Sequence, residues 1–203
     1  MTAHPIYFLR HGETAWNRER RLQGQRDTEL NELGHNQARA IAACLADTLP
    51  DISGFYFHVS PLQRARQTMA YVQETLGISD DALKIDERLA EKSFGVYDGR
   101  TWGELNSEGI DPEFAPEAYY EWQPEGGESY AGATKRVAEW LSELSAPAVV
   151  VSHGGISRIL RGIVLSLPGH EIVRLKVPQN RFFRLADGSI EWFDAAPYAA
   201  GKI

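Results

Sequence analysis

The sequence predicts an α/β fold, a three-layer α/β/α sandwich around a mostly parallel sheet. Two observations predict it. Segments typical of strands alternate with segments of helical periodicity, which is the order that produces parallel sheets. In addition, two continuous apolar runs, residues 6–9 and 148–151, are each followed within two residues by a histidine–glycine pair. Such runs are typical of buried strands, and ligands bind beyond the carboxyl ends of parallel strands.

The strands are predicted from short runs rich in β-branched and aromatic residues. The parallel strands are expected at residues 6–9, 55–59, 83–85 and 148–151. Two further runs, residues 181–185 and 189–193, flank Asp187-Gly188, a turn signal that predicts a β-hairpin.

Four helices are predicted between these strands. Apolar residues at helical spacing indicate helices over residues 36–49, from Pro61 to about residue 76, around residues 137–144, and after residue 153. Pro61 suits a first helical position and Ser60 an N-cap, and Gly77 would end that helix.

Length and composition favour one soluble domain. The 203 residues, 43% of them apolar, suit a single domain over residues 1–203. No apolar run reaches the ~18 residues of a membrane helix, and the start, Met-Thr-Ala-His-Pro, lacks the order of a signal peptide. The only cysteine, Cys44, excludes an internal disulfide and is expected to be buried in a helix. We therefore expect a cytoplasmic protein that does not bind membranes.

Charge is distributed unevenly along the chain. The net charge of −7 argues against binding to nucleic acid. From Asp98 to Tyr130 there are nine acidic residues and one basic residue, Arg100, so this segment carries −8 and the rest of the chain +1. Residues 96–128 are rich in Gly, Pro and aromatic residues and are expected to be an irregular, lid-like insertion.

The residues at the predicted strand ends suit a phosphate monoester. Arg10 offers a planar fork to phosphate oxygens, and neutral His11 has a nitrogen lone pair that can attack phosphorus. His153 opens a helix and adds a donor, and Arg64 follows one turn into the helix after the second strand. Glu91 would protonate the leaving oxygen.

Each residue has a simpler interpretation when it is considered alone. A histidine before glycine is usually part of a turn, Arg64 could pair with a surface acid, and Glu91 could be solvated. A zinc site at the two histidines is disfavoured, because an adjacent arginine opposes a cation and no HExxH or Cys-His cluster is present. The conjunction of five such residues at successive strand-to-helix junctions favours a phosphate site.

The ordered set of motifs resembles the histidine phosphatase superfamily, also called the phosphoglycerate mutase-like family. The similarity runs from residue 6 to about residue 160. Its motifs are Arg10-His11-Gly12-Glu13-Thr14, Trp16-Asn17, Gln23-Gly24, Ser60-Pro61-Leu62 with Arg64, Glu91 with Phe94-Gly95, Pro124 with residues 126–129, and Ser152-His153-Gly154-Gly155.

This resemblance implies the histidine phosphatase fold and a phosphohistidine intermediate on His11. It implies that Arg10, Arg64 and His153 form the phosphate pocket and that Glu91 donates a proton and later activates water. Asn17, Gln23, Gly24 and Gly154 are expected as further phosphate contacts. No metal and no cofactor is implied, and the partner would be a small phosphomonoester. A homodimer is permitted by the sequence but not required by it.

Two questions about function stay open in the sequence. The mutases that the chain resembles carry a longer insertion after the proton donor, with a lysine and two arginines that hold the substrate carboxylate and second phosphate. The acidic segment here lacks them, which favours hydrolysis over mutase activity, with an inactive binding module as a third alternative. Acids and aromatic residues facing the leaving group would favour a neutral or cationic one, but the aromatic residues could equally be the core of the insertion.

Overall fold

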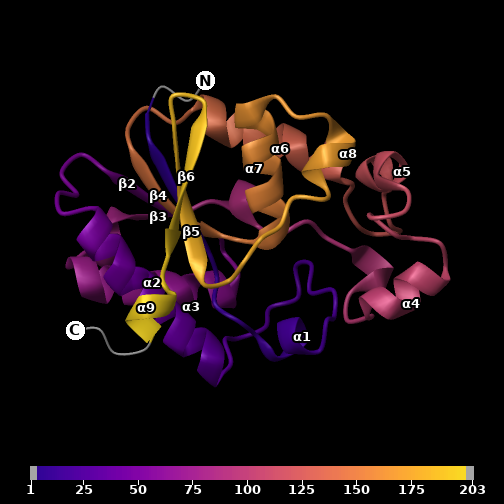
Figure 1. Ribbon diagram of the computed structural model, residues 1–203, viewed down its shortest axis with the longest axis horizontal. Helices are drawn as coiled ribbons and strands as arrows, with labels where there is room; N and C mark the ends of the chain where they lie inside the picture. Colours follow the sequence, from indigo (N-terminus) through magenta and orange to yellow (C-terminus); the bar gives the residue numbers. More distant parts are fainter. Residues whose placement is uncertain (1–3, 200–203) are drawn as a thin grey trace.

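The computed structural model describes residues 4–199 and arranges them around one six-stranded sheet (Figure 1). The strand order is β3-β2-β4-β1-β5-β6. The bounds are β1 Ile6–Arg10, β2 Tyr56–Val59, β3 Leu83–Ile85, β4 Ala148–Ser152, β5 Arg181–Ala186 and β6 Ser189–Asp194. β3, β2, β4 and β1 pair in parallel, and β5 is antiparallel to both of its neighbours. The predicted mostly parallel sheet and its hairpin are confirmed.

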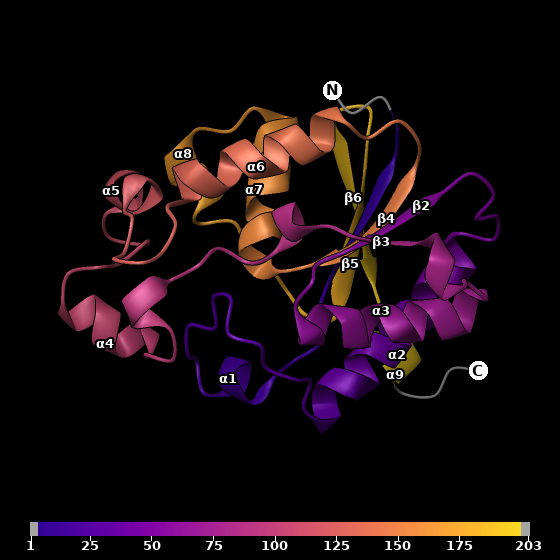
Figure 2. The same ribbon diagram turned by 180° about the vertical axis from the view of Figure 1, so that it is seen from behind.

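Two pairs of long helices cover the two faces of the sheet (Figures 1 and 2). α2 (Glu32–Thr48) and α3 (Gln63–Leu76) contribute to one apolar core, and α6 (Tyr130–Ser142) and α7 (Gly154–Leu165) contribute to the other. The structure is therefore the predicted three-layer α/β/α sandwich.

β1 and β4 are apolar up to their last residues, Arg10 and Ser152, and both of their faces are buried. In β1, Ile6 and Phe8 belong to the core beneath α6 and α7, whereas Tyr7 and Leu9 belong to the core beneath α2 and α3. β4 alternates in the same way between the two cores. Period-two alternation between two dry faces explains why these strands appear in the sequence as uninterrupted apolar runs.

Short elements complete the chain. They are α1 (Ala15–Arg18), α4 (Trp102–Ser107), α5 (Pro116–Glu121), α8 (Gly169–Ile172), α9 (Ala196–Ala199) and the 3₁₀ helices η1 (Asp80–Ala82), η2 (Glu87–Leu89) and η3 (Gly95–Tyr97). Cys44 is buried in α2, as predicted. Within residues 4–199, every helix is too short or too polar to cross a bilayer.

The starts of two helices differ from the prediction. α2 begins at Glu32 rather than Asn36, because the Asn31 side chain accepts a hydrogen bond from the Gly34 N–H and caps the helix. α3 begins at Gln63 with Leu62 at the N-cap, so Ser60 is not the cap and Pro61 is not the first helical residue. The Ser60 hydroxyl contacts His153 instead, at 2.6 Å from Nε2.

The segment 96–128 is more regular than predicted, because it contains α4 and α5. Thr101 and Glu104 form a capping box at the start of α4, and Pro116 stands at the start of α5. The Trp102 and Trp122 rings both pack against Tyr119, with ring centroids 6.1 and 5.7 Å away. These aromatic residues therefore form a small core, whereas Phe114 is 90% exposed.

Two glycines allow the loop after β1 to approach the start of α2. A Cβ atom on Gly12 would lie 2.2 Å from the Gly34 carbonyl oxygen, and one on Gly34 would lie 2.0 Å from the Glu13 carbonyl oxygen. Both neighbours are backbone atoms that cannot rotate away. Glycine is therefore required at both positions for the chain that follows β1 to take this path.

We predict that Gly34→Ala lowers the free energy of unfolding by about 1–3 kcal/mol, because the added methyl group overpacks a backbone contact. Gly103→Ala is the matched control, since Gly103 lies in α4 and a Cβ atom there would lie 3.9 Å from Thr101 Oγ1, an ordinary van der Waals contact. It should be neutral or stabilising. Urea unfolding curves of the three proteins measure the difference, and equal stability of Gly34→Ala and wild type would contradict the close approach.

Candidate active site

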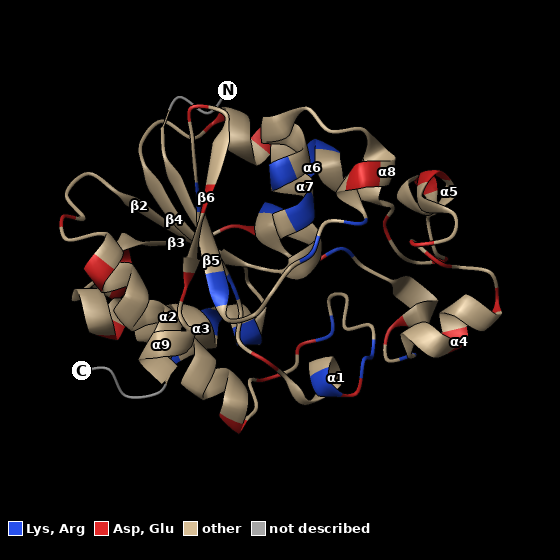
Figure 3. Ribbon diagram, viewed as in Figure 1, with Lys and Arg blue, Asp and Glu red and all other residues tan. Residues whose placement is uncertain are grey.

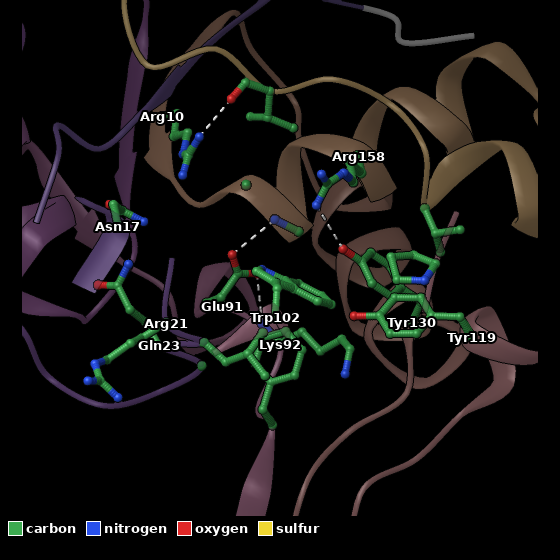
Figure 4. Close-up of a pocket in the computed structure, with 18 of the residues that line it drawn as sticks. Arg10, Asn17, Arg21, Gln23, Glu91, Lys92, Trp102, Tyr119, Tyr130 and Arg158 are labelled. Atoms are coloured by element: carbon green, nitrogen blue, oxygen red, sulfur yellow. Dashed lines mark hydrogen bonds between the residues drawn. The ribbon is translucent and has the colours of Figure 1, made fainter. Parts of the chain in front are cut away.

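A cavity of about 270 Å³ lies beyond the carboxyl ends of β1 and β4 (Figure 4). The predicted residues that line it are Arg10, His11, Asn17, Gln23, Gly24, Arg64, Glu91 and Gly154. They come from separate parts of the chain, and the sheet brings them together. Of the nine residues predicted for the site, only His153 does not line the cavity.

His11 has one nitrogen committed to the backbone and the other facing a cation. Nδ1 lies 2.7 Å from the carbonyl oxygen of Gly12. A carbonyl oxygen only accepts hydrogen bonds, so Nδ1 carries the proton in the neutral ring and Nε2 keeps its lone pair. Arg64 Nε donates to this Nε2 over 3.3 Å. The hydrogen bonds thus select the tautomer that has a nucleophilic Nε2.

The surroundings of His11 keep the ring neutral. Burial is the main cause that lowers the pKa of His11 well below its usual value, and the charges of Arg64 and Arg10 lower it further. Each of these makes the imidazolium form less favourable. At pH 7 the ring therefore retains its lone pair.

Arg10 and Arg64 are cations held mainly by carbonyl oxygens. Arg10 Nη1 donates to the Val177 carbonyl at 2.6 Å, and Arg64 donates to the carbonyls of Arg26 and Gly24, each at 2.8 Å. Burial is the main cause that lowers the pKa of each guanidinium to about 10, so both remain charged at pH 7. Within residues 4–199, neither forms a salt bridge with a carboxylate. Their charge is available to an anionic ligand.

His153 lies beside His11 and is completely buried. The two ring centroids are 5.1 Å apart, and His153 Nε2 contacts the Ser60 hydroxyl. Nδ1 is buried with no hydrogen-bond partner among the residues that the structure describes. A direct contact of this residue with phosphate stays a prediction, because His153 does not line the cavity.

Glu91 is fixed by two backbone N–H groups. Oε2 accepts from Gly155 N–H at the start of α7, and Oε1 accepts from Lys92 N–H, both at 2.9 Å. Gly155 is close enough that a Cβ there would lie 2.3 Å from Oε1. The carboxyl group is thereby held against the helix N-terminus, facing the cavity.

The remaining predicted contacts line the side of the cavity near α1. Gln23 Oε1 accepts from the hydroxyls of Thr14 and Thr28, at 2.8 and 2.6 Å, which orients the amide so that its NH₂ group is free to donate. Asn17 Oδ1 accepts from Gln179 Nε2 at 3.1 Å, and its amide is likewise left as a donor. Gly24, at a φ of +50°, turns its carbonyl oxygen toward Arg64.

The structure adds lining residues that the sequence analysis did not select. They are Arg21, Leu22, Lys92, Phe94, Trp102, Pro112, Glu113, Tyr119, Tyr130, Gly155, Arg158, Val173 and Val177. Arg158 could have been found, because it lies about one turn into the helix after His153, as Arg64 does after the second strand. Trp102, Tyr119 and Tyr130 belong to the aromatic residues for which the sequence left two alternatives open, the core of the insertion or a surface facing the leaving group. They line the cavity, and Trp102 and Tyr119 also pack against each other.

Contrary to the expectation, the acids of the segment mostly point away from the cavity, although Trp102, Pro112 and Tyr119 of the same segment line it. Of its nine acids only Glu113 is a lining residue, and its side chain is 79% exposed. Arg100 pairs with Glu108, and Arg136 pairs with Glu128. Figure 3 shows red on α4 and α5, and blue on α7 and around α1. The expectation that these acids face the leaving group and favour a neutral or cationic one is therefore not supported by the structure.

A metal ion would need several ligands grouped at the site. Among residues 4–199, no three His, Cys, Asp or Glu side chains are grouped as a metal site would require. Metal independence itself stays a prediction.

The chain is similar in sequence and in structure to known phosphatases, and in sequence to a phosphoglycerate mutase. The glucosyl-3-phosphoglycerate phosphatase of Mycobacterium tuberculosis is 33% identical over 181 residues, which are 83% of this chain and 78% of that protein. A 2,3-bisphosphoglycerate-dependent phosphoglycerate mutase of Chelativorans is 29% identical over 187 residues, 85% of this chain and 86% of the mutase. A solved structure of a mycobacterial glucosyl-3-phosphoglycerate phosphatase with VO₃ has a TM-score of 0.76 and 32% identity, covering 95% of this chain and 97% of the other.

A protein-family model shows to which family the chain belongs. The histidine phosphatase superfamily (branch 1) matches residues 6–186, which include every residue predicted for the site. The chain belongs to the histidine phosphatase superfamily.

Proposed function

We propose that this protein is a metal-independent phosphomonoester hydrolase that acts through a phosphohistidine on His11. The observation that carries the proposal is the Nε2 lone pair of His11, fixed by the Gly12 carbonyl and facing Arg64. A neutral imidazole between two guanidinium groups suits attack on a phosphate dianion, because the cations bind the oxygens and the ring supplies the electron pair.

The first step would transfer the phosphoryl group to the protein. His11 Nε2 forms a bond to phosphorus while the bond between phosphorus and the ester oxygen breaks. The leaving oxygen takes a proton from the Glu91 carboxyl group, which faces the same cavity. Arg10, Arg64 and the N-terminus of α7 stabilise the charge on the phosphoryl oxygens.

The second step would release phosphate. Glu91, now a carboxylate, takes a proton from water as the water oxygen bonds to phosphorus and the nitrogen–phosphorus bond breaks. This restores neutral His11, the protonated Glu91 and free inorganic phosphate. The same carboxyl group thus serves as acid and then as base.

Phosphoglycerate mutase activity is the second candidate, because relatives of this chain include a mutase. Hydrolysis is favoured because a mutase must shield the phosphohistidine from water and hold a doubly anionic glycerate by its insertion. Within the segment 96–128, Arg100 is the only cation, and it pairs with Glu108. The named substrate of the mycobacterial relative, glucosyl-3-phosphoglycerate, is also a phosphate ester that is hydrolysed.

We predict that the protein hydrolyses p-nitrophenyl phosphate equally well with and without EDTA, and that His11→Ala lowers kcat by at least a hundredfold. The loss follows because covalent transfer needs the Nε2 lone pair. Quenching a turnover with base should trap one acid-labile phosphate on wild type and none on the variant. Turnover that survives in His11→Ala, or that requires a metal, would contradict the mechanism. No turnover of any monoester would favour a binding module.

We predict that His11 stays neutral to well below pH 6.5 and that Arg64→Gln raises its pKa. Removing a nearby positive charge makes the protonated ring more favourable, so the pKa moves upward. Titration of the ring by NMR measures this shift. Arg66→Gln is the matched control, because Arg66 lies on the exposed face of the same helix and should leave the His11 pKa nearly unchanged. Equal pKa values in wild type and Arg64→Gln would disprove the electrostatic coupling.

A further prediction separates the two candidate activities. When the protein is given 3-phosphoglycerate, inorganic phosphate should form at least ten times faster than 2-phosphoglycerate. The reason is that the segment 96–128 offers no free cation to hold the glycerate while the phosphoryl group is transferred back. ³¹P NMR follows both products at once. If 2- and 3-phosphoglycerate interconvert faster than phosphate is released, the protein is a mutase rather than a hydrolase.

A further inference from the structure

The cavity has a second cationic end, away from the residues around α1. In Figure 4, Arg158 lies with Tyr130 and Tyr119 on the opposite side of Glu91 from Asn17 and Gln23. We propose that Arg158, Tyr130 and Tyr119 form a subsite for a carboxylate on the leaving group, so that the preferred substrates are phosphate monoesters of carboxylic acids. This proposal rests on the proposed function, because it assigns the substrate class of the same cavity.

Arg158 is a cation that the protein holds but does not neutralise. Nε donates to the Leu175 carbonyl at 2.7 Å, and Nη1 donates to the Tyr130 hydroxyl at 3.3 Å. Within residues 4–199, Nη2 has no hydrogen-bond partner and no carboxylate forms a salt bridge with the guanidinium group. Two neutral acceptors thus fix the plane of the fork and leave one edge free. A fixed guanidinium with a free edge is suited to a carboxylate.

The two tyrosines add hydroxyl groups at the same place. Tyr130 accepts from Arg158, so its own proton is free to be donated. The Tyr119 hydroxyl is buried and has no hydrogen-bond partner among the described residues. Burial is the main cause that raises the pKa of both phenols, which therefore remain donors at neutral pH. A buried donor without an acceptor is costly, and an oxygen of the ligand would satisfy it.

The net positive charge of the residues that line the cavity is larger than the negative charge of a phosphate monoester. Among the lining residues, Arg21 pairs with Glu19, and Glu113 pairs with Arg174. The charges that remain are those of Arg10, Arg64, Lys92 and Arg158, because the proposed mechanism starts with Glu91 protonated. These four positive charges are two more than a phosphate monoester dianion neutralises. Arg158 also lies close enough to Arg10 for the two like charges to repel, and this repulsion is one cause of the lowered pKa of Arg10. One carboxylate beside Arg158 would relieve it.

The first experiment compares two esters that differ only at the proposed contact. 3-Phosphoglycerate and glycerol 3-phosphate carry a carboxylate and a hydroxymethyl group on the same carbon. We expect wild type to prefer 3-phosphoglycerate by at least tenfold in kcat/KM, consistent with charge-assisted hydrogen bonds. Arg158→Gln should reduce that ratio about tenfold, and Arg158→Lys should recover part of it. The control, Arg161→Gln, removes a cation from the same helix that contacts Phe183 and Trp192, and should keep the ratio.

The second experiment measures binding without turnover. Calorimetry gives the dissociation constants of 3-phosphonopropionate and propylphosphonate, which differ by a carboxylate in place of a methyl group. Wild type should bind 3-phosphonopropionate more tightly, and Arg158→Gln should lose that difference. Tyr119→Phe, which keeps the ring and its packing, should reduce it by about three- to tenfold.

The outcomes separate this proposal from the proposed function. Equal affinity of wild type for the two phosphonates, or equal losses for both in Arg158→Gln, would overturn the carboxylate subsite even if the protein is an active phosphatase. Discrimination between the phosphonates without hydrolysis of any ester would support the subsite and overturn the hydrolase. Thermal unfolding of each variant identifies any that lose discrimination because they do not fold.

Discussion

β1 and β4 pair in parallel at the centre of the sheet, with Arg10 opposite Ser152. The His11 N–H donates to the Ser152 carbonyl at 3.0 Å, which continues the pairing past the end of β1. This register places His11 next to His153 and sets α7 beside the loop that follows β1. A slip of one residue would turn every side chain of β1 to the other face of the sheet. The position of His11, the proposed nucleophile, is thus a property of the strand pairing rather than of the loop that carries it.

The electrostatic character of the site follows from where its cations lie. Arg10, Arg64 and Arg158 are held by carbonyl oxygens and a hydroxyl, not by carboxylates. Burying a charge without a counterion destabilises the folded protein, and an anionic ligand offsets that cost when it binds. Burial is the main cause that keeps His11 neutral, and the charges of Arg64 and Arg10 add to it. The proposed phosphate affinity and the proposed activation of His11 therefore share part of their cause.

Much of this arrangement could be predicted from the sequence, and the exceptions have physical reasons. Arg10, His11 and Glu91 were identified because strand-to-helix junctions of a parallel sheet share one edge. The N-cap assigned to Ser60 was wrong because its hydroxyl contacts His153, a residue far away in the chain. The orientation of the acidic segment could not be predicted, since α4 and α5 are too short to show a periodic face. The start of α4 could, however, have been predicted, because Thr101 and Glu104 have the spacing of a capping box.

The contact between Gly12 and Gly34 has a consequence for how the sequence can vary. Gly12 follows Arg10 and His11 at the proposed active site, whereas Gly34 lies at the start of a helix that supplies no residue to the cavity. Because each glycine makes room for the backbone of the other segment, a side chain at either position would displace both. Substitutions at the two positions are therefore not independent of each other. A screen for tolerated substitutions would find Gly34 as restricted as a residue of the proposed active site.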